Sequence, residues 1–422
     1  MRNLILNTDS YKTSHYAQYP ANAEYVSSYI ESRGGDYPAT VFFGLQAFIK
    51  EYLTRQITQA DIDEAEVICT AHGVPFNREG WDYILESYEG YLPIEIEAAP
   101  EGAIVPTGNV LVQVRNTDPK CAWLTSYVET ALLRAVWYPT TVATVSRNCR
   151  NIIARYLEET ADATEGWHFK RHDVGARGAS SEETAALGGA AHLVNFAGTD
   201  TLSGILAARR YYGADMAGFS IPAAEHSTIT SWGRDGEADA YANMIEQFGG
   251  EGRLVSVVSD SYDIWNAIDN LWGDALKAQV EAMGGTLVIR PDSGEPVEIV
   301  PEAVERLMAR FGYTVNSKGY RVLPDCVRLI QGDGVCAESI EAILEAMKAR
   351  GQSADNVAFG MGGRLLQKMD RDTQKFAMKA SAICVDGQWR DVYKDPITDP
   401  GKRSKRGRLA LQRTANGYET VR

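Results

Sequence analysis

The region after Thr160 repeats one pattern, and that pattern constrains the fold more than any other feature of the chain. A short apolar run ends in glycine, aspartate, arginine, serine or histidine, and in most cases a helical segment follows. Successive strand–helix units predict a parallel sheet. Seven such units over roughly 200 residues fit an irregular barrel of the (β/α)₈ kind better than an open sheet. The seven runs are Phe169–Asp173, Leu193–Phe196, Met216–Ser220, Leu254–Val258, Leu287–Ile289, Val327–Ile330 and Val357–Phe359.

The two ends of the chain follow a different pattern. Short strands separated by glycine and proline lie between residues 94 and 114, which is typical of antiparallel sheet. Alternating segments, Lys375–Val385 and Gln388–Tyr393, flank Asp386-Gly387, which is a strong hairpin signal. We therefore predict an α+β domain that is formed by residues 1–160 and 374–422, and a barrel over residues 161–373 that carries the active-site strand ends.

Composition narrows the range of functions. The chain has 422 residues and a formal net charge of -14, which argues against non-specific binding to nucleic acid or to an anionic membrane. The six cysteines form no CxxC pair, so they are expected to be reduced thiols of a cytoplasmic protein. The N-terminus turns polar within a few residues, and no apolar run approaches the ~20 residues of a membrane span.

The stretch TLVIRPDSGEP shows what the strand ends can do chemically. A buried strand ends at Arg290, and Asp292 follows after one proline. A guanidinium can hold a phosphate through its planar fork, and a carboxylate can bind sugar hydroxyls or a hydrated Mg²⁺. The alternative is a salt-bridged loop between strand and helix.

Two adjacent predicted strands end in glycine-rich segments, Gly332-Asp333-Gly334 and Gly360-Met361-Gly362-Gly363. Bare glycines let backbone N–H groups approach a phosphate, and barrels often bind phosphate at their last two strands. The alternative is that these glycines serve tight turns that need a positive φ.

Other strand ends carry further polar groups. Arg177 and His226 can join Arg290 in holding anionic oxygens, although a histidine can also merely satisfy a core hydrogen bond. Asp200 can accept a hydrogen bond from an NH₂ group or cap the helix that starts near Thr201. The carboxylates that can bind Mg²⁺ or a ribose diol are Asp263, Asp292 and Asp333. Together these groups indicate a phosphorylated sugar as ligand without naming the reaction.

Long strings along the chain, from near the N-terminus to about Leu411, resemble the nicotinate/nicotinamide phosphoribosyltransferase family, and within it the enzymes that use nicotinamide. They occur in the family's order. The strings are NTDSYKTSHYAQYP, GASSEETAALGGAAHLVNFAGTDT, SIPAAEHSTITSWG, VSVVSDSYDIWNA, IRPDSG, IQGDG, GGRLLQKMDRD and KDPITDPGKRSKRGRL.

The resemblance implies a type II phosphoribosyltransferase barrel and a homodimer in which the partner's other domain completes each active site. It implies nicotinamide and 5-phosphoribosyl 1-diphosphate as substrates, Mg²⁺ as cofactor, and nicotinamide mononucleotide and diphosphate as products of NAD salvage. It also implies ATP hydrolysis through a phosphohistidine, which improves the equilibrium.

The resemblance also implies roles for single residues, and these roles follow the groups of the substrate. The diphosphate is expected to meet Arg177, His226 and Arg290, with His226 as the phosphorylated histidine. The ribose is expected to meet Asp292, Gly332 and Asp333. The 5′-phosphate is expected to meet Gly362, Gly363 and the partner's Arg33, Arg371 and Lys379.

For the base, the resemblance implies that Asp200 accepts the carboxamide NH₂ and that the partner's Tyr11 stacks on the pyridine ring. Asp263 and Asp292 are expected to support the metal-bound diphosphate indirectly. The residues expected to act in catalysis are His226, Asp292, Asp263 and Arg290. No general base is expected, because the pyridine nitrogen is already a nucleophile.

The chain departs from the family pattern at four points, one of which is a brief loop after Arg33. Val174 stands where the family usually has an aromatic residue opposite the stacking tyrosine, and this loss of ring contact costs on the order of a kcal/mol. Ala377 stands where a serine helps to hold the phosphate. The chain ends at Arg422, short of the usual tail. We expect the departure at Val174 to weaken base affinity or selectivity.

Three alternative functions are considered. Nicotinate phosphoribosyltransferase is disfavoured by Asp200, because a carboxylate that faces a nicotinate carboxylate is repulsive. A non-catalytic nicotinamide mononucleotide-binding protein has less need of the diphosphate-binding residues His226, Arg290 and Asp292. An unrelated barrel enzyme that acts on a sugar phosphate is disfavoured by the length of the matching strings.

Overall fold

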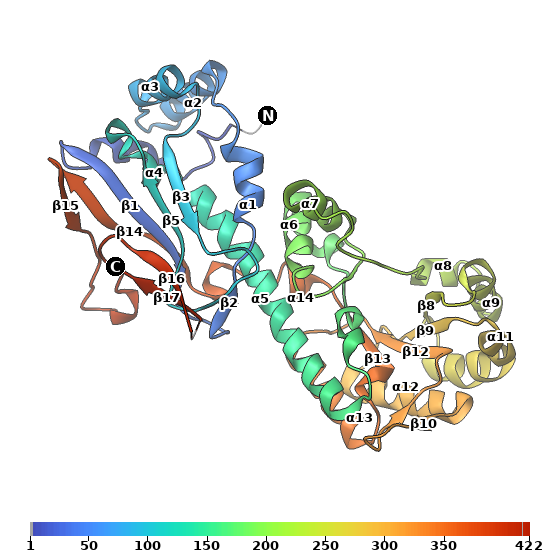
Figure 1. The fold of residues 1–422 in the computed structure, drawn as a ribbon. Helices are drawn as coiled ribbons and strands as arrows, with labels where there is room; N and C mark the ends of the chain where they lie inside the picture. Colours follow the sequence, from blue (N-terminus) through green and yellow to red (C-terminus); the bar gives the residue numbers. More distant parts are fainter. Residues whose placement is uncertain (1–2, 416) are drawn as a thin grey trace. The chain divides into compact units, whose positions relative to one another are not determined.

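The computed structural model describes residues 3–415 and 417–422, and they form two compact units (Figure 1). Unit 1 contains the chain up to Thr144 together with Met369–Arg422, and unit 2 is Val145–Lys368. The division falls inside helix α5 (Glu129–Thr160), whereas the sequence pattern places it at residues 160 and 373. Each unit is described by itself.

Unit 1 is built on a five-stranded sheet in which every neighbouring pair is antiparallel. The C-terminal strands return to the N-terminal part of the chain, because β14 pairs with β1 along nearly its whole length. The predicted turn is confirmed: Asp386 has φ 52° and Gly387 has φ 72°, as a two-residue hairpin turn requires. In spatial order the strands are β15 (Gln388–Asp391), β14 (Phe376–Val385), β1 (Ala23–Ser32), β5 (Val110–Asn116) and β3 (Ile94–Ala98).

The two faces of this sheet are covered differently. One face presents Ile30, Val112 and Met378 to the main core of unit 1, which also contains Trp81 and Trp123 from the helical layer. The opposite face is covered only in part, where Tyr29 packs against Leu409 and Val110. The remaining elements of unit 1 are η1 (Ser10–Ala17), β2 (Ala39–Val41), α1 (Leu45–Phe48), η2 (Ile49–Leu53), α2 (Gln59–His72), α3 (Arg78–Tyr88), β4 (Ile104–Pro106), η3 (Pro119–Cys121), α4 (Leu124–Tyr127), η8 (Arg371–Thr373), η9 (Pro400–Lys402), β16 (Ala410–Thr414) and β17 (Gly417–Val421).

Unit 2 is built on a six-stranded sheet whose neighbours are all parallel. In spatial order the strands are β7 (Gly198–Thr199), β6 (Arg171–Asp173), β13 (Val357–Met361), β12 (Val327–Gln331), β9 (Thr286–Arg290) and β8 (Leu254–Val258). The residues between the strands form helices, as the strand–helix pattern predicts. The predicted fold class, an irregular α/β barrel with a second α+β part on an antiparallel sheet, is confirmed.

The segment around residues 219–223 closes the ring between the two edge strands. Phe219 forms a parallel bridge with Gly198 of β7, and Ala223 forms one with Ser256 of β8. The Phe219 N–H donates to the carbonyl of Ala197 at 2.7 Å. The predicted strand Met216–Ser220 therefore contributes one isolated bridge, at Phe219, in place of a regular strand, which is why the barrel is irregular.

Two predicted elements were wrong. Leu193–Phe196 is no strand, because the Phe196 N–H donates to the carbonyl of His192 and continues the last turn of α6 (Glu182–His192). The strand begins later and contains only Gly198–Thr199. The sequence pattern also predicts two amphipathic helices, Ala122–Trp137 and Thr141–Glu159, whereas the structure has one continuous helix, α5, that contains Pro139.

The other elements of unit 2 are η4 (Glu165–Phe169), η5 (Ala176–Gly178), α7 (Leu202–Tyr212), α8 (His226–Thr230), α9 (Glu237–Phe248), α10 (Ile264–Asn266), η6 (Ala267–Ala275), α11 (Lys277–Ala282), α12 (Pro296–Phe311), β10 (Thr314–Val315), β11 (Arg321–Val322), α13 (Ala337–Ala349), η7 (Ala354–Asn356) and α14 (Gly363–Leu366). Within the part of the chain that the structure describes, no helix has the length and apolar character that a bilayer crossing needs.

Candidate active site

The predicted site residues of unit 2 follow the carboxyl ends of its strands. Because neighbouring strands are parallel, these ends lie on one rim of the barrel, where such folds carry their active sites. Strand by strand, the residues are Val174 and Arg177 after β6, Asp200 after β7, Asp263 after β8, Arg290 and Asp292 at the end of β9, Gly332 and Asp333 after β12, and Gly362 and Gly363 after β13. His226 is the first residue of α8, just beyond the segment that closes the ring.

A buried carboxylate that sequence reasoning missed connects three of these strand ends. Asp260, whose side chain is only 4% exposed, accepts a hydrogen bond from His226 Nε2 at 2.9 Å through its Oδ1. Its Oδ2 accepts the backbone N–H of Asp292, also at 2.9 Å, and the hydroxyl of Ser293. Asp260 thus holds the imidazole and the loop after β9 in fixed positions.

The same contacts set the ionisation of Asp260 and the tautomer of His226. Burial raises the pKa of Asp260, but hydrogen bonds from Ser293, His226 and the Asp292 backbone outweigh burial and hold its pKa below the usual value. An ionised Asp260 can only accept a hydrogen bond, so His226 Nε2 carries the proton. The lone pair of the neutral ring is then on Nδ1, which lies 3.9 Å from Asp292 Oδ2.

Arg290 and Asp292 place opposite charges at the end of β9, as the sequence predicts. Burial raises the pKa of Asp292, and the nearby Asp260 and Asp333 carboxylates raise it further, while the Arg290 cation opposes them. Arg290 Nε is buried and has no hydrogen-bond partner among the described residues. A buried guanidinium donor of this kind is suited to an anionic ligand.

The glycine-rich strand ends differ in how closely other groups approach them. A Cβ on Gly332 would lie 3.5 Å from Asp292 Oδ1, and a Cβ on Gly175 would lie 2.8 Å from the carbonyl oxygen of Gly362. The alternative of tight turns with positive φ applies to Gly334, at 67°, but neither Gly332 nor Gly363 has a positive φ. Turn geometry with a positive φ therefore does not explain Gly332 and Gly363.

Asp200 lies where β6 and β7 end side by side. Its backbone N–H donates to the carbonyl of Asp173 at 2.8 Å, and its Oδ1 accepts the hydroxyl of Ser220. The N-cap position of α7 belongs to Thr201, so the capping alternative for Asp200 is not observed. Val174 is close by on the same strand end, with methyl groups 3.6 and 3.7 Å from where a Cβ on Gly360 would lie.

Asp263 is placed differently from the other predicted carboxylates. Its Oδ1 accepts the backbone N–H groups of Trp265 and Asn266 at 3.0 and 3.1 Å, so it caps helix α10. Asp260, three residues earlier, makes the contacts with the histidine and the β9 loop. The sequence could have identified Asp260, because in the string SDSYD it is the aspartate that follows the buried strand more closely.

Four predicted residues belong to unit 1. Tyr11, in η1, is 60% exposed, Arg33 follows β1, and Lys379 is in β14. Arg371 lies in η8 and forms an ion pair with its neighbour Asp372 at 3.2 Å. These four residues are therefore described with unit 1.

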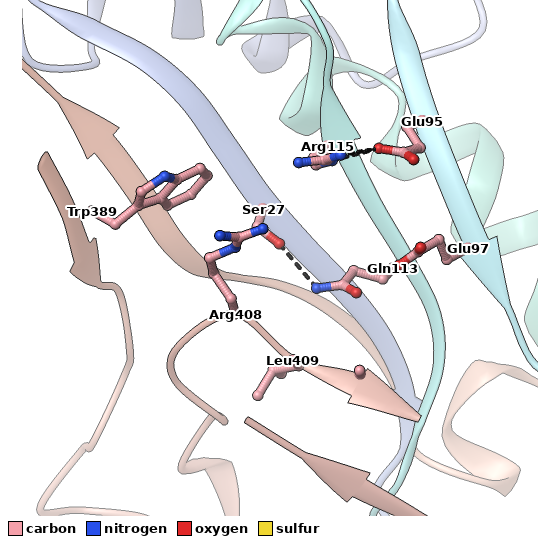
Figure 2. Close-up of a pocket in the computed structure, with 9 residues that line it drawn as sticks. Ser27, Glu95, Glu97, Gln113, Arg115, Trp389, Arg408 and Leu409 are labelled. Carbon is pink, nitrogen blue, oxygen red and sulfur yellow. Dashed lines mark hydrogen bonds and ion pairs between the residues drawn. The ribbon is translucent and has the colours of Figure 1, made fainter. Parts of the chain in front are cut away.

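A pocket of about 370 Å³ lies on the sheet of unit 1 (Figure 2). Charged groups of both signs line it, and Arg115 pairs with Glu95 across β5 and β3. The lining residues are Ser27, Glu95, Glu97, Gln113, Arg115, Trp389, Arg408, Leu409 and Ala410, and none of the predicted site residues is among them.

The carboxylates of the rim suit a metal ion that arrives with its ligand. Among the described residues, no three His, Cys, Asp or Glu side chains come together as a set of metal ligands. Mg²⁺ usually keeps several waters and binds through one or two carboxylates together with substrate phosphates. A half-buried Asp292 beside Arg290 fits that use.

Comparison with known proteins gives a consistent result along the chain. Residues 169–421 match the nicotinate phosphoribosyltransferase (NAPRTase) family, and residues 3–96 match the nicotinamide phosphoribosyltransferase N-terminal domain. A nicotinamide phosphoribosyltransferase of Xanthomonas campestris pv. campestris is 59% identical over 97% of this chain and 88% of its own length. A nicotinamide phosphoribosyltransferase of Acinetobacter baylyi is 34% identical over 97% of this chain and 88% of its own length.

Solved structures support the fold. A nicotinate-nucleotide pyrophosphorylase from Pyrococcus furiosus superposes with a TM-score of 0.62 and covers 99% of this chain and 84% of its own, at 16% identity. At that identity the likeness concerns the fold alone.

The contacts of Asp260 predict how stability depends on pH. Because the folded-state pKa is lowered, Asp260 stabilises the fold above its unfolded pKa of about 4, and this contribution disappears as the pH falls through the folded value. Asp260→Asn should lower the free energy of unfolding by about 1–3 kcal/mol at pH 7. It should also flatten the loss of stability between about pH 5 and pH 2.

Urea unfolding of the wild type and the variant at a series of pH values measures both effects. Asp215→Asn makes the same chemical change at an exposed position of unit 2 and serves as control. Equal pH slopes for the wild type and Asp260→Asn would show that the pKa of Asp260 is not lowered in the folded protein.

Proposed function

Because the chain belongs to the nicotinate phosphoribosyltransferase family, we propose that it transfers the phosphoribosyl group of 5-phosphoribosyl 1-diphosphate to nicotinamide in NAD salvage. The products are nicotinamide mononucleotide and diphosphate. The observation that carries this choice of base is the similarity to proteins named nicotinamide phosphoribosyltransferase, one of them 59% identical over 97% of the chain. Asp200 on the barrel rim supports it.

In the proposed reaction the bond from C1′ of the ribose to the diphosphate oxygen breaks, and a bond from the pyridine nitrogen to C1′ forms. Positive charge develops on the ribose ring and negative charge on the leaving diphosphate. Electrostatic stabilisation and positioning therefore supply the rate. Arg177, Arg290 and His226 hold the leaving diphosphate, and the free Nε donor of Arg290 supports this role.

The ribose and its 5′-phosphate are held at the next two strand ends. Asp292, Gly332 and Asp333 bind the ribose, and the position of Gly332 beside the Asp292 carboxylate supports this assignment. Gly362 and Gly363 meet the 5′-phosphate, and the partner's Arg33, Arg371 and Lys379 complete its site. This last assignment requires a homodimer with shared active sites, which is part of the proposal, as is a cytoplasmic location.

The base is recognised by Asp200. Its Oδ1 is engaged by Ser220, so Oδ2 is the oxygen that accepts the carboxamide NH₂. A nicotinate carboxylate in the same place would face a like charge and lose binding energy. Val174 borders the ring on one side, and the partner's Tyr11 stacks on the other.

Mg²⁺ and ATP are the proposed cofactor and co-substrate. Bound Mg²⁺ would supply positive charge to the departing diphosphate, with Asp292, and Asp263 at longer range, supporting it through the diphosphate. ATP would transfer its γ-phosphoryl group to His226 Nδ1 and leave as ADP. The hydrogen bond between Nε2 and Asp260 supports this choice of nitrogen, because it leaves the Nδ1 lone pair available.

Turnover with competing bases tests the proposal. The purified protein receives 5-phosphoribosyl 1-diphosphate, Mg²⁺ and equal amounts of nicotinamide and nicotinate, and the mononucleotide is identified by mass. We expect nicotinamide mononucleotide alone. The acid mononucleotide would indicate a nicotinate phosphoribosyltransferase with a base pocket altered at Val174, and no product from either base would indicate a non-catalytic binding protein.

Replacing the charge of Asp200 tests base recognition. Asp200→Asn keeps the size of the side chain and removes the repulsion of nicotinate, so the ratio of kcat/KM for nicotinamide to that for nicotinate should fall at least about tenfold. The exposed Asp215→Asn variant controls for a general effect of lost charge. An unaltered ratio in Asp200→Asn would remove Asp200 from the base site.

Removing the imidazole tests the link to ATP. His226→Ala lacks the nitrogen that accepts the phosphoryl group, so it should lose ATP stimulation while it retains some ATP-independent synthesis. Initial rates with and without ATP, together with a search for acid-labile protein phosphate, measure this. A variant that keeps the wild-type response to ATP would show that His226 is not the acceptor.

A further inference from the structure

A buried carboxylate, Glu31, lies on the face of the unit 1 sheet that the main core leaves uncovered. It pairs with Ala377 across β1 and β14, and its side chain is only 3% exposed. Tyr29 and Lys379 pair at the next position on the same face. Lys379 is thus a diagonal neighbour of Glu31 on this face, and its Nζ donates to the carbonyl of Met378 at 2.6 Å.

Two cations from separate parts of the chain bind Glu31. Arg33 Nε donates to Oε1 at 3.1 Å, and Lys405 Nζ donates to Oε2. The side chains of Arg33 and Lys405 are 17% and 26% exposed. The carboxylate therefore lies beneath the two cations, which reach the surface.

Lys405 belongs to the basic run Lys402–Arg408, which composition alone would leave as a solvated surface segment. The structure anchors this run on the sheet face. The Lys405 N–H donates to the Tyr29 hydroxyl at 2.7 Å, and the Gly407 N–H donates to the carbonyl of Ser381 at 2.8 Å. Figure 2 shows the end of the run, where the Arg408 guanidinium lies 5.1 Å from the centre of the Trp389 ring.

Cations outnumber carboxylates in this part of the sheet. Arg33, Lys379, Lys405 and Lys12 carry four positive charges against the two negative charges of Glu31 and Glu129, on a chain whose net charge is -14. Arg33 Nη2 is buried and lacks a hydrogen-bond partner among the described residues. Burial lowers the pKa of Lys379, and the nearby Arg33 cation lowers it further despite the opposing Glu129 carboxylate. A bound anion would relieve both the unused donor and the repulsion between cations.

We propose that Arg33, Lys379 and Lys405 form one phosphate-binding site on unit 1, in which Glu31 is a positioning residue. The ligand class is a phosphate monoester, and its identity as the 5′-phosphate of the phosphoribosyl substrate rests on the proposed function. Lys405 and Glu31 are the residues that this inference adds. Glu31 touches no substrate atom and acts by holding the Arg33 and Lys405 cations at one spacing.

A structural salt bridge is the competing explanation, and Glu31→Gln separates the two. By charge alone, loss of a carboxylate should strengthen anion binding. If Glu31 positions the two cations, its loss lets them move apart and weakens binding although the site becomes more positive. We expect the Kd for ribose 5-phosphate and the KM for 5-phosphoribosyl 1-diphosphate to rise several-fold, with the KM for nicotinamide unchanged. Tighter anion binding in Glu31→Gln would overturn the positioning role.

Lys405→Met tests the new ligand residue independently of Glu31. Loss of one charge-assisted hydrogen bond to phosphate should raise the Kd for ribose 5-phosphate about tenfold or more, as measured by titration calorimetry on the full-length protein. Lys405→Arg should restore most of the affinity. Arg403→Met is the matched control, because it removes a cation of the same run that is 62% exposed and contacts Asp395 at 3.7 Å.

The binding measurement separates this inference from the proposed function. Ribose 5-phosphate has neither the diphosphate nor the base, so its binding needs no turnover. A wild type that binds it with a Lys405-dependent affinity, yet forms no mononucleotide, would keep the phosphate site and refute the proposed reaction. Mononucleotide synthesis with the same Kd and KM in Lys405→Met as in the wild type would keep the reaction and refute the site.

Discussion

Parallel hydrogen bonding between neighbouring strands is the constraint on which the second unit depends. The ladder from β7 to β8 directs every carboxyl end to one rim, and the bridges at Phe219 and Ala223 close the ring. Strand pairing thereby brings together residues that are far apart in the sequence, and their own side chains need not attract one another for this to happen. The rim could host other chemistry on the same frame, since function in such barrels comes from the residues that follow the strands.

Buried carboxylates organise the polar groups in both units. Asp260 lies beneath His226 and the β9 loop, and Glu31 lies beneath Arg33 and Lys405. In each case the acid is almost fully buried while its partners stay accessible. A buried charge is stable only when it is well paired, so each carboxylate keeps its partners in one arrangement. These partners are therefore in position before a ligand binds.

Much of the fold and of the candidate site was predictable, because strand length, apolar character and the polar residues that follow are local properties. The strands β8, β9, β12 and β13 and the hairpin at Asp386-Gly387 were correctly predicted for this reason. The apolar run Leu193–Phe196 misled, since a short apolar run does not distinguish a strand from the end of a helix. Pro139 misled too, because packing around α5 overrides the local preference to end a helix there.

The sequence by itself determined the family, the class of fold and the chemical character of the rim, since these follow from local pattern and from long matching strings. Only the tertiary structure decided which carboxylate contacts His226. Asp260 and Asp263 lie after one strand, yet one turns into the ring and the other caps a helix. It also decided that Lys405 meets Glu31, a contact between residues 374 positions apart. Such contacts depend on the direction in which each side chain points in the folded chain, and composition and spacing do not predict that direction.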